Sequence, residues 1–474
     1  MVEKITEKIY NGENKKEKSM IDKVREVALK VLYKIDEEKA YSNIALDEEL
    51  KINKNKLEER DIGLISEIVY GVTTWKLTLD TIIRKHSNIR IKKISPWILN
   101  NLRMGVYQII FLDKIPKSAA VNESVNLSKR YGHKSSSNFT NAILRKIEKS
   151  DYEELFEIKD DIERISKTNS MPVWVIEKLL KENSVEIVEE ICKSSNIRPK
   201  MHIRVNTLKT NKQEIKKEIE RQNAEVYDGL LNDFLIVNKA KKIEENELFK
   251  KGMFTVQDEA AGIIPIILNP NENEKVLDAC SAPGGKTTYM AEIMGNKGTI
   301  EAWDIHEHRT KLIEQTAKRL EINIINTKVK DASVYDEIYF ELFDKILLDV
   351  PCLGIGVLKR KPDIKWQKKE EDIQEISKIQ ENILKNCSKY LKKGGELIYS
   401  TCSILKEENE KIIEKFLNEN ENFEIINIGN EEDLKEVKSY VKNLKNNVKN
   451  NKYIQIYQNE NSDGFFICKL KKIY

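Results

Sequence analysis

The strongest constraint on the fold is an alternation of short apolar segments with amphipathic helical patterns, which begins at Lys275. This alternation is typical of parallel strands joined by crossover helices. We therefore expect residues 270–474 to form a doubly wound, Rossmann-like α/β domain. In such a sheet, ligands bind at the carboxyl ends of the strands. The strands are predicted at residues 275–279, 298–303, 326–330, 343–349 and 395–400.

The chain before this domain follows a different pattern. From Asp22 to Lys149, apolar residues recur at helical spacing and no segment favours a strand, so residues 20–150 are predicted to be an all-helical domain. Residues 151–269 open with two helical patterns. A strand at 203–206, a helix and two further strands follow, which predicts a small α+β connector domain.

Two polar segments lack the pattern of a core. Residues 1–19 predict a disordered tail. The Asn/Lys-rich segment 442–452 predicts a solvated loop ahead of a last strand in GFFICKL.

Composition narrows the class of protein. Hydrophobic residues make up 40% and charged residues 34% of the chain, as in a soluble globular protein. No segment approaches the roughly 18 apolar residues of a membrane span, and none resembles a secretion signal. The six cysteines are scattered without a CxxC spacing, so we expect thiols in a reducing cytoplasm and no metal site. A net charge of +3 neither requires nor excludes nucleic acid, because binding depends on clustered charge.

A glycine-containing turn follows the first predicted strand, within DACSAPGGKTT (278–288). Gly284 and Gly285 let the backbone pass close to a ligand, and the helix that follows offers free N–H groups. The turn matches neither GxGxxG nor the P-loop pattern, which disfavours a phosphate cradle. The alternative is a tight strand-to-helix turn without a ligand.

Single carboxylates follow the next two strands. Asp304 is placed to bind the ribose hydroxyls of a nucleoside-containing cofactor, or to cap the helix after it. Asp331 suits an adenine amino group or a plain turn. His306 and His308 have no further histidine nearby, which disfavours a metal.

A carboxylate and two cysteines follow the fourth and fifth strands. Asp349 and Cys352 come after one strand, and Cys402 comes after the other. A carboxylate in this position is costly to bury unless another group pairs with it. Because the two strands are expected to be neighbours, we predict that both thiols and the carboxylate converge in one crevice. A buried structural role is the interpretation for the remaining cysteines outside the glycine turn, Cys192, Cys387 and Cys468.

Taken together, DACSAPGGKTT, AWDIHEHR, LLDVPCLGIGVLKRKPDIKW and IYSTCSILKEENE resemble the signatures of the RNA 5-methylcytosine methyltransferases of the Fmu/Sun type. The region with YGVTTW, LRMGVYQIIFL and NFTNAILRK resembles a NusB-type RNA-binding domain. The likeness spans nearly all of the chain after the tail. It implies an S-adenosyl-L-methionine-dependent enzyme that methylates carbon 5 of a cytosine in 16S ribosomal RNA, before or during small-subunit assembly. We expect a monomer.

The resemblance also implies roles for single residues. Carbon 5 of cytosine is a poor nucleophile, and a thiolate that adds to carbon 6 activates it. Cys402 is the implied nucleophile, Cys352 assists product release, Asp349 contacts the base, and Lys286 is an electrostatic helper. Strand position does not fix the order of the cysteines, because DNA methyltransferases of related chemistry use the PC cysteine. The residues implied to contact the cofactor are Cys280, Ser281, Ala282, Pro283, Gly284, Gly285, Lys286, Asp304, Asp331 and Asp349.

A basic segment lies just past the PC motif. Lys359, Arg360 and Lys361 are placed to hold phosphate, and Trp366 is placed to stack on a base. The alternative is a solvated basic loop.

Three other functions stay open. A transfer RNA cytosine methyltransferase would use the same chemistry. A non-catalytic RNA-binding or antitermination factor would keep the fold as a scaffold, although intact Asp349, Cys352 and Cys402 argue against it. A nucleotide-dependent oxidoreductase would lack GxGxxG and leave both cysteines unexplained. Incubation of RNA with a radiolabelled methyl donor separates the methyltransferases from the other two.

Overall fold

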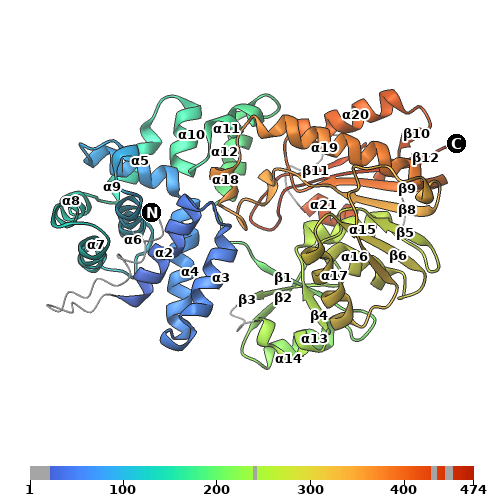
Figure 1. Cartoon of the computed structure of the whole chain (residues 1–474), viewed down its shortest axis with the longest axis horizontal. Helices are drawn as coiled ribbons and strands as arrows, with labels where there is room; N and C mark the ends of the chain where they lie inside the picture. The colour runs from blue at the N-terminus through green and yellow to red at the C-terminus, as the bar shows by residue number, and fades with distance from the viewer. Residues whose placement is uncertain (1–21, 239–242, 429–434, 444–451) are drawn as a thin grey trace, which may run out of the picture. The chain divides into compact units, whose positions relative to one another are not determined.

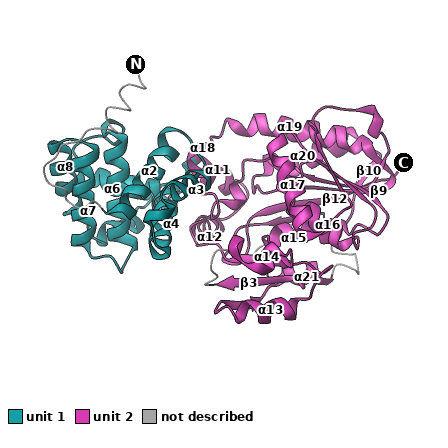
Figure 2. Cartoon of the chain, turned by 60° about the horizontal axis from the view of Figure 1, so that its bottom comes forward, with its two compact units in different colours: residues 1–173 teal, residues 174–474 magenta. Residues whose placement is uncertain are grey.

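The structure is a computed structural model that describes residues 22–238, 243–428, 435–443 and 452–474 (Figure 1). The chain divides into two compact units, residues 1–173 and residues 174–474 (Figure 2). The predicted tail, 1–19, lies outside the described residues.

Unit 1 is helical throughout its described residues, which confirms the expectation for the segment from Asp22 to Lys149. Asp22 caps the first helix, because its side chain accepts hydrogen bonds from the N–H groups of Val24 and Arg25. Pro96 opens the central helix, where its missing N–H costs nothing. The helices are α2 (Lys23–Glu37), α3 (Ser42–Ile52), α4 (Glu59–Thr74), α5 (Lys76–His86), α6 (Pro96–Phe111), α7 (Lys117–Tyr131), α8 (Lys134–Leu144), α9 (Ser150–Glu153) and α10 (Asp161–Asn169).

Unit 2 begins with two helices and a small antiparallel sheet in the order β2-β3-β1-β4. The predicted strand–helix–strand–strand series is present. The structure adds β2, a short strand that the sequence did not suggest because two of its four side chains are exposed. The elements are α11 (Val173–Leu180), α12 (Val185–Ser194), β1 (Met201–Val205), α13 (Lys212–Glu220), β2 (Glu225–Asp228), β3 (Phe234–Asn238), α14 (Glu247–Lys250) and β4 (Phe254–Val256).

The large sheet of unit 2 has the strand order β10-β12-β9-β8-β5-β6-β7, with β11 paired to β12. Neighbours from β9 to β7 are parallel, and β12 runs antiparallel to β9. This confirms the doubly wound domain and the adjacency of the fourth and fifth predicted strands. The strands are β5 (Lys275–Asp278), β6 (Thr299–Asp304), β7 (Ile325–Val329), β8 (Phe343–Asp349), β9 (Leu391–Thr401), β10 (Phe423–Ile425), β11 (Ile454–Ile456) and β12 (Phe465–Lys472).

Helices accompany this sheet and bury apolar strands between them. Val276, Leu277, Ile346, Leu347 and Leu348 are fully buried, as expected for parallel strands. The helices are α15 (Glu259–Leu268), α16 (Gly285–Ile293), α17 (Glu307–Leu320), α18 (Ile364–Gln367), α19 (Asp372–Cys387), α20 (Glu410–Glu419) and α21 (Lys435–Asn443).

Strand order reverses between β5 and β8, so a crevice is expected beside their carboxyl ends. The predicted loop at 442–452 is only partly described. Its first two residues close α21, and residues 444–451 lie outside the described part. Across the described chain, no helix combines the length and the apolar character that a bilayer crossing requires.

Candidate functional site

The turn after β5 is held in one conformation by its neighbours. Gly284 has φ +100°, and a Cβ on it would lie 3.2 Å from the backbone of Ile313, so the position requires glycine. The N–H and Oγ of Ser281 both donate to the carbonyl of Trp303, at 2.8 and 2.7 Å. The turn is therefore tied to β6 and presents the first residues of α16 at the crevice.

Asp278 lies buried beneath this turn. The Oγ1 of Thr287 donates to its Oδ2 at 2.7 Å, whereas its Oδ1 is buried without a partner among the described residues. Burial raises the pKa of Asp278 to about 7. A buried polar atom without a hydrogen-bond partner is expected where the neighbouring glycine turn binds a polar ligand.

The carboxylates after β6 and β7 make local hydrogen bonds. Asp304 accepts from the N–H of His306 at 3.0 Å and pairs with Arg309 at 3.2 Å. Arg309 also donates to the carbonyl of Ala282 at 3.0 Å, which links this carboxylate to the glycine turn. Asp331 accepts from the N–H and Oγ of Ser333. Asp304 and Asp331 thus follow two neighbouring parallel strands, β6 and β7.

Lys286 and Asp349 form an ion pair at the switch point between β5 and β8. The Nζ of Lys286 lies 2.6 Å from Asp349 Oδ2, and the Oγ of Ser400 donates to Asp349 Oδ1 at 2.9 Å. Burial opposes the charged form of Lys286, but the Asp349 carboxylate outweighs it, so the pKa of Lys286 is raised. The crevice therefore contains a fixed ammonium–carboxylate pair.

The two strand-end cysteines lie beside each other. The Sγ atoms of Cys352 and Cys402 are 2.7 Å apart, both residues are free thiols, and both are partly exposed. The hydrogen bond with Cys402 and then burial raise the pKa of Cys352 well above its ordinary value. Cys352 therefore remains a protonated thiol at neutral pH. The predicted convergence of two thiols and one carboxylate is present.

The basic segment past the PC motif has mostly internal partners. Lys359 donates to two backbone carbonyls of residues 459–462 and lies 3.4 Å from Asp463. Arg360 donates to Asp463 at 2.5 Å. Lys361 is exposed, and Trp366 is half-buried in α18. Lys359 and Arg360 thus anchor the segment, and Lys361 stands in solvent.

Sequence reasoning did not single out Arg204. It is fully buried in β1, and its guanidinium donates to both carboxylate oxygens of Glu292, at 2.8 and 3.1 Å. It also donates to the carbonyl of Gly285 at 2.8 Å, so it links β1 to the glycine turn. The available signal was an arginine between the apolar residues Ile203 and Val205 of the strand MHIRV.

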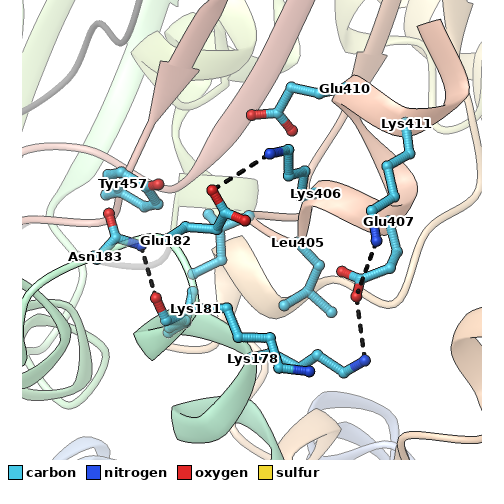
Figure 3. Close-up of a pocket in the computed structure, with 12 residues that line it drawn as sticks. Lys178, Lys181, Glu182, Asn183, Leu405, Lys406, Glu407, Glu410, Lys411 and Tyr457 are labelled. Atoms are coloured by element: carbon cyan, nitrogen blue, oxygen red, sulfur yellow. Dashed lines mark hydrogen bonds and ion pairs between the residues drawn. The ribbon is translucent and has the colours of Figure 1, made fainter. Parts of the chain in front are cut away.

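A pocket of about 90 Å³ lies behind the segment that follows Cys402 (Figure 3). Lys178 lies 3.1 Å and Lys411 3.8 Å from Glu407, and Lys406 lies 3.3 Å from Glu182. These opposite charges face one another across the pocket, so its charge is largely balanced. The pocket is not an evident site for an anion.

The parallel sheet, the glycine turn at its switch point and the strand-end carboxylates define an S-adenosylmethionine-dependent methyltransferase domain. The paired PC and TC thiols beside them, with a helical unit ahead in the chain, mark the enzymes of this class that act on RNA.

Comparison with known proteins identifies the family. The family described as "16S rRNA methyltransferase RsmB/F" matches residues 265–471, the NusB family matches 22–149, and an RsmF/B-like ferredoxin-like domain matches 171–244. A Bacillus subtilis protein named "Probable ribosomal RNA small subunit methyltransferase B" is 35% identical over 95% of this chain and 98% of its own length. A ribosomal RNA small subunit methyltransferase B of Shewanella oneidensis is 32% identical over 83% and 89%. The crystal structure of PH0851 covers 95% of this chain and 99% of that one, with 28% identity and a TM-score of 0.77. The chain belongs to the ribosomal RNA small subunit methyltransferase B family.

Proposed function

We propose that this protein transfers a methyl group to carbon 5 of a cytosine in 16S ribosomal RNA, through a transient bond between Cys402 Sγ and carbon 6 of the base. The observation that carries the proposal is the 2.7 Å approach of the Cys352 and Cys402 sulfurs. These thiols follow β8 and β9, and Asp349 pairs with Ser400 across the same two strands. A nucleophile, a second thiol and a carboxylate at one strand edge match covalent pyrimidine catalysis.

S-adenosylmethionine would be held along the glycine turn, Asp304 and Asp331, and would supply an electrophilic methyl group with S-adenosylhomocysteine as the leaving group. Addition of the Cys402 thiolate to carbon 6 of the base makes carbon 5 nucleophilic enough to accept a methyl group. Asp349 hydrogen-bonds the cytosine edge, and the adjacent Lys286 ammonium offsets negative charge in the crevice. Transfer of the carbon 5 proton to water then restores the ring double bond and expels the Cys402 thiolate. Cys352 assists this last step.

The base must leave its stack to meet Cys402, so the target is a single-stranded or looped cytosine. The RNA is held mainly by the domain of residues 20–150. A groove of about 620 Å³ between α7 and α8 supports this assignment, because Lys117, Lys129 and Arg145 line it together with serine, asparagine and valine side chains. Among the described residues, no carboxylate contributes to its lining, which suits a phosphate backbone. Lys361 and Trp366 contact RNA near the crevice.

The family matches at 22–149, 171–244 and 265–471 support our division into an RNA-binding domain, a connector domain of residues 151–269 and a catalytic domain of residues 270–474. One chain contains every residue of the site, so we propose a monomer. A reaction that depends on free thiols fits the reducing cytoplasm.

The test is methyl transfer from radiolabelled S-adenosylmethionine to protein-free 16S ribosomal RNA, to small subunits and to transfer RNA. We expect labelling of 16S RNA, and bisulfite sequencing should place the mark at one cytosine. Labelling of transfer RNA alone would select the transfer RNA alternative. Binding without labelling of any RNA would select the non-catalytic factor.

A further inference from the structure

A fully buried carboxylate connects the two cysteine-bearing turns. Glu408 Oε2 accepts from the N–H of Leu353 at 2.9 Å and from Nε2 of Gln380 at 3.1 Å. Its Oε1 accepts from the Oγ of Ser403. Gln380 Nε2 also donates to the carbonyl of Pro351 at 2.9 Å. Leu353 and Ser403 each directly follow a cysteine, so Glu408 acts one residue away from both reactive sulfurs.

This arrangement is energetically demanding, because a buried carboxylate is costly unless several donors satisfy it. Burial raises the pKa of Glu408, and the hydrogen bonds from Ser403, Leu353 and Gln380 oppose that rise. The Oγ of Ser403 and the N–H of Leu353 converge on one rigid group. Loss of this group would release the turn after β8 and the turn after β9 at once.

We infer that Glu408 is a positioning residue that holds the turns of Cys352 and Cys402 in register and keeps Cys402 as the attacking thiol. The inference rests on the proposed function. The negative charge of Glu408 is also among the groups that raise the pKa of Cys352, after Cys402 and burial. Glu408 therefore disfavours ionisation of Cys352.

Glu407 provides a matched control. It is the adjacent glutamate, but it points to the lysines of the pocket in Figure 3 and lies 3.1 Å from Lys178. Glu408→Gln keeps the shape of the side chain, removes its charge and replaces one acceptor oxygen with an NH₂ group, which faces either Ser403 or the donors of Leu353 and Gln380. Glu407→Gln removes the same charge one residue away without touching either turn.

The experiment compares both variants with the wild type in the full chain. We expect Glu408→Gln to lower kcat at least tenfold, with the KM for S-adenosylmethionine within twofold. Iodoacetamide labelling read by peptide mass spectrometry should show Cys352 gaining reactivity relative to Cys402. Glu407→Gln should leave kcat and the labelling ratio unchanged. Labelling needs no RNA, so it tests the inference even if the proposed substrate is wrong.

Equal kcat in Glu408→Gln and wild type, or an equal loss in both glutamate variants, would overturn the inference. An unchanged labelling ratio in folded Glu408→Gln would do the same. If Glu408→Gln does not fold, Ser403→Ala serves instead, because it removes only the hydroxyl that donates to Glu408 and accepts from the N–H of Leu405, and leaves the carboxylate in place. We expect Ser403→Ala to lower kcat at least threefold, and wild-type kcat in that variant would count against a positioning role.

Discussion

The Nζ of Lys286 lies 2.6 Å from Oδ2 of Asp349, so an ammonium from the helix after the first catalytic strand meets a carboxylate from the fourth. The side chains are only 15% and 25% exposed, so water screens the pair poorly. The Asp349 carboxylate raises the pKa of Lys286 against its burial, so the ammonium stays charged beside the two thiols.

This pair should behave as one unit in kinetics. Lys286→Met or Asp349→Asn removes one charge and leaves the other poorly solvated, and we expect each to lower kcat at least a hundredfold. The double variant should lose about as much as either single variant, because coupled residues are not additive. Single-turnover methyl transfer measures the effect. The control pair is Lys345→Met and Glu396→Gln. In the wild type these two side chains form an ion pair of 3.3 Å that joins β8 to β9, nearer the start of β8. Additive losses at Lys286 and Asp349 would contradict the coupling.

The roles of the two cysteines can be separated on a denaturing gel. Cys402→Ala should lose turnover and form no adduct with RNA that carries 5-fluorocytosine, because the attacking sulfur is absent. Cys352→Ala should accumulate a gel-stable adduct with ordinary RNA, because release is blocked. Cys387→Ala, a buried cysteine of α19, should retain turnover. The opposite pattern of adducts would exchange the two roles.

Asp278 should make stability depend on pH. Burial raises its pKa from 3.8 to about 7, so the native state keeps a proton that the unfolded chain has released. Between these pH values the unfolded state binds fewer protons, and stability falls as pH rises, by up to about 1.4 kcal/mol per pH unit. Asp278→Asn removes this dependence. The free energy of unfolding of Asp278→Asn, minus that of the wild type, should increase from pH 5 to 7 and then level off.

Urea unfolding of the cofactor-free protein at several pH values gives this difference. Asp344→Asn is the control, because paired lysine and backbone donors lower the pKa of Asp344 against its burial. Its contribution is present above about pH 4 and is lost only below, so its difference from wild type should stay constant from pH 5 to 8. A flat difference for Asp278→Asn would show that Asp278 is ionised in the native state.

The groove between α7 and α8 should set RNA affinity and leave chemistry unchanged. Lys129→Glu with Arg145→Glu should weaken RNA binding at least tenfold at low salt and reduce the slope of log K against log salt by about 2. At saturating RNA, kcat should stay within threefold of wild type. Lys167→Glu, on α10 outside the groove, is the control for reversal of a surface charge elsewhere in the same unit. Fluorescence anisotropy across a salt series measures the slope, and equal effects at both places would refute a specific contact.

Much of the catalytic sheet could be predicted because its strands are buried on both faces, as Val276 and Leu347 are, and so form continuous apolar runs. Asp349, Cys352 and Cys402 could be located for a related reason, since reactive groups in such sheets follow the strands. Strand β2 could not be predicted, because Tyr227 and Asp228 are exposed and leave no alternation.

The long-range hydrogen bonds and ion pairs that support the site could not be predicted from the sequence, for a different reason. Glu408 is one of three glutamates in KEENE, and no local pattern singles out the one whose carboxylate joins the two cysteine turns. Lys359 and Arg360 form a basic run that suggests a solvated surface, yet their partner Asp463 comes about a hundred residues later. Long-range pairing decides such cases, and the neighbours of a residue in the chain do not reveal it.

Arg204 has a practical consequence for anyone who wishes to shorten this enzyme. A fragment that started at residue 265 would keep the whole methyl-transfer crevice but lose the cation opposite Glu292, which is itself buried. Removing one partner of a buried pair costs about 3–5 kcal/mol, a large part of the stability of a typical domain. The smallest fragment that folds on its own therefore includes the small antiparallel sheet, and fragments cut between the two sheets should express as insoluble material.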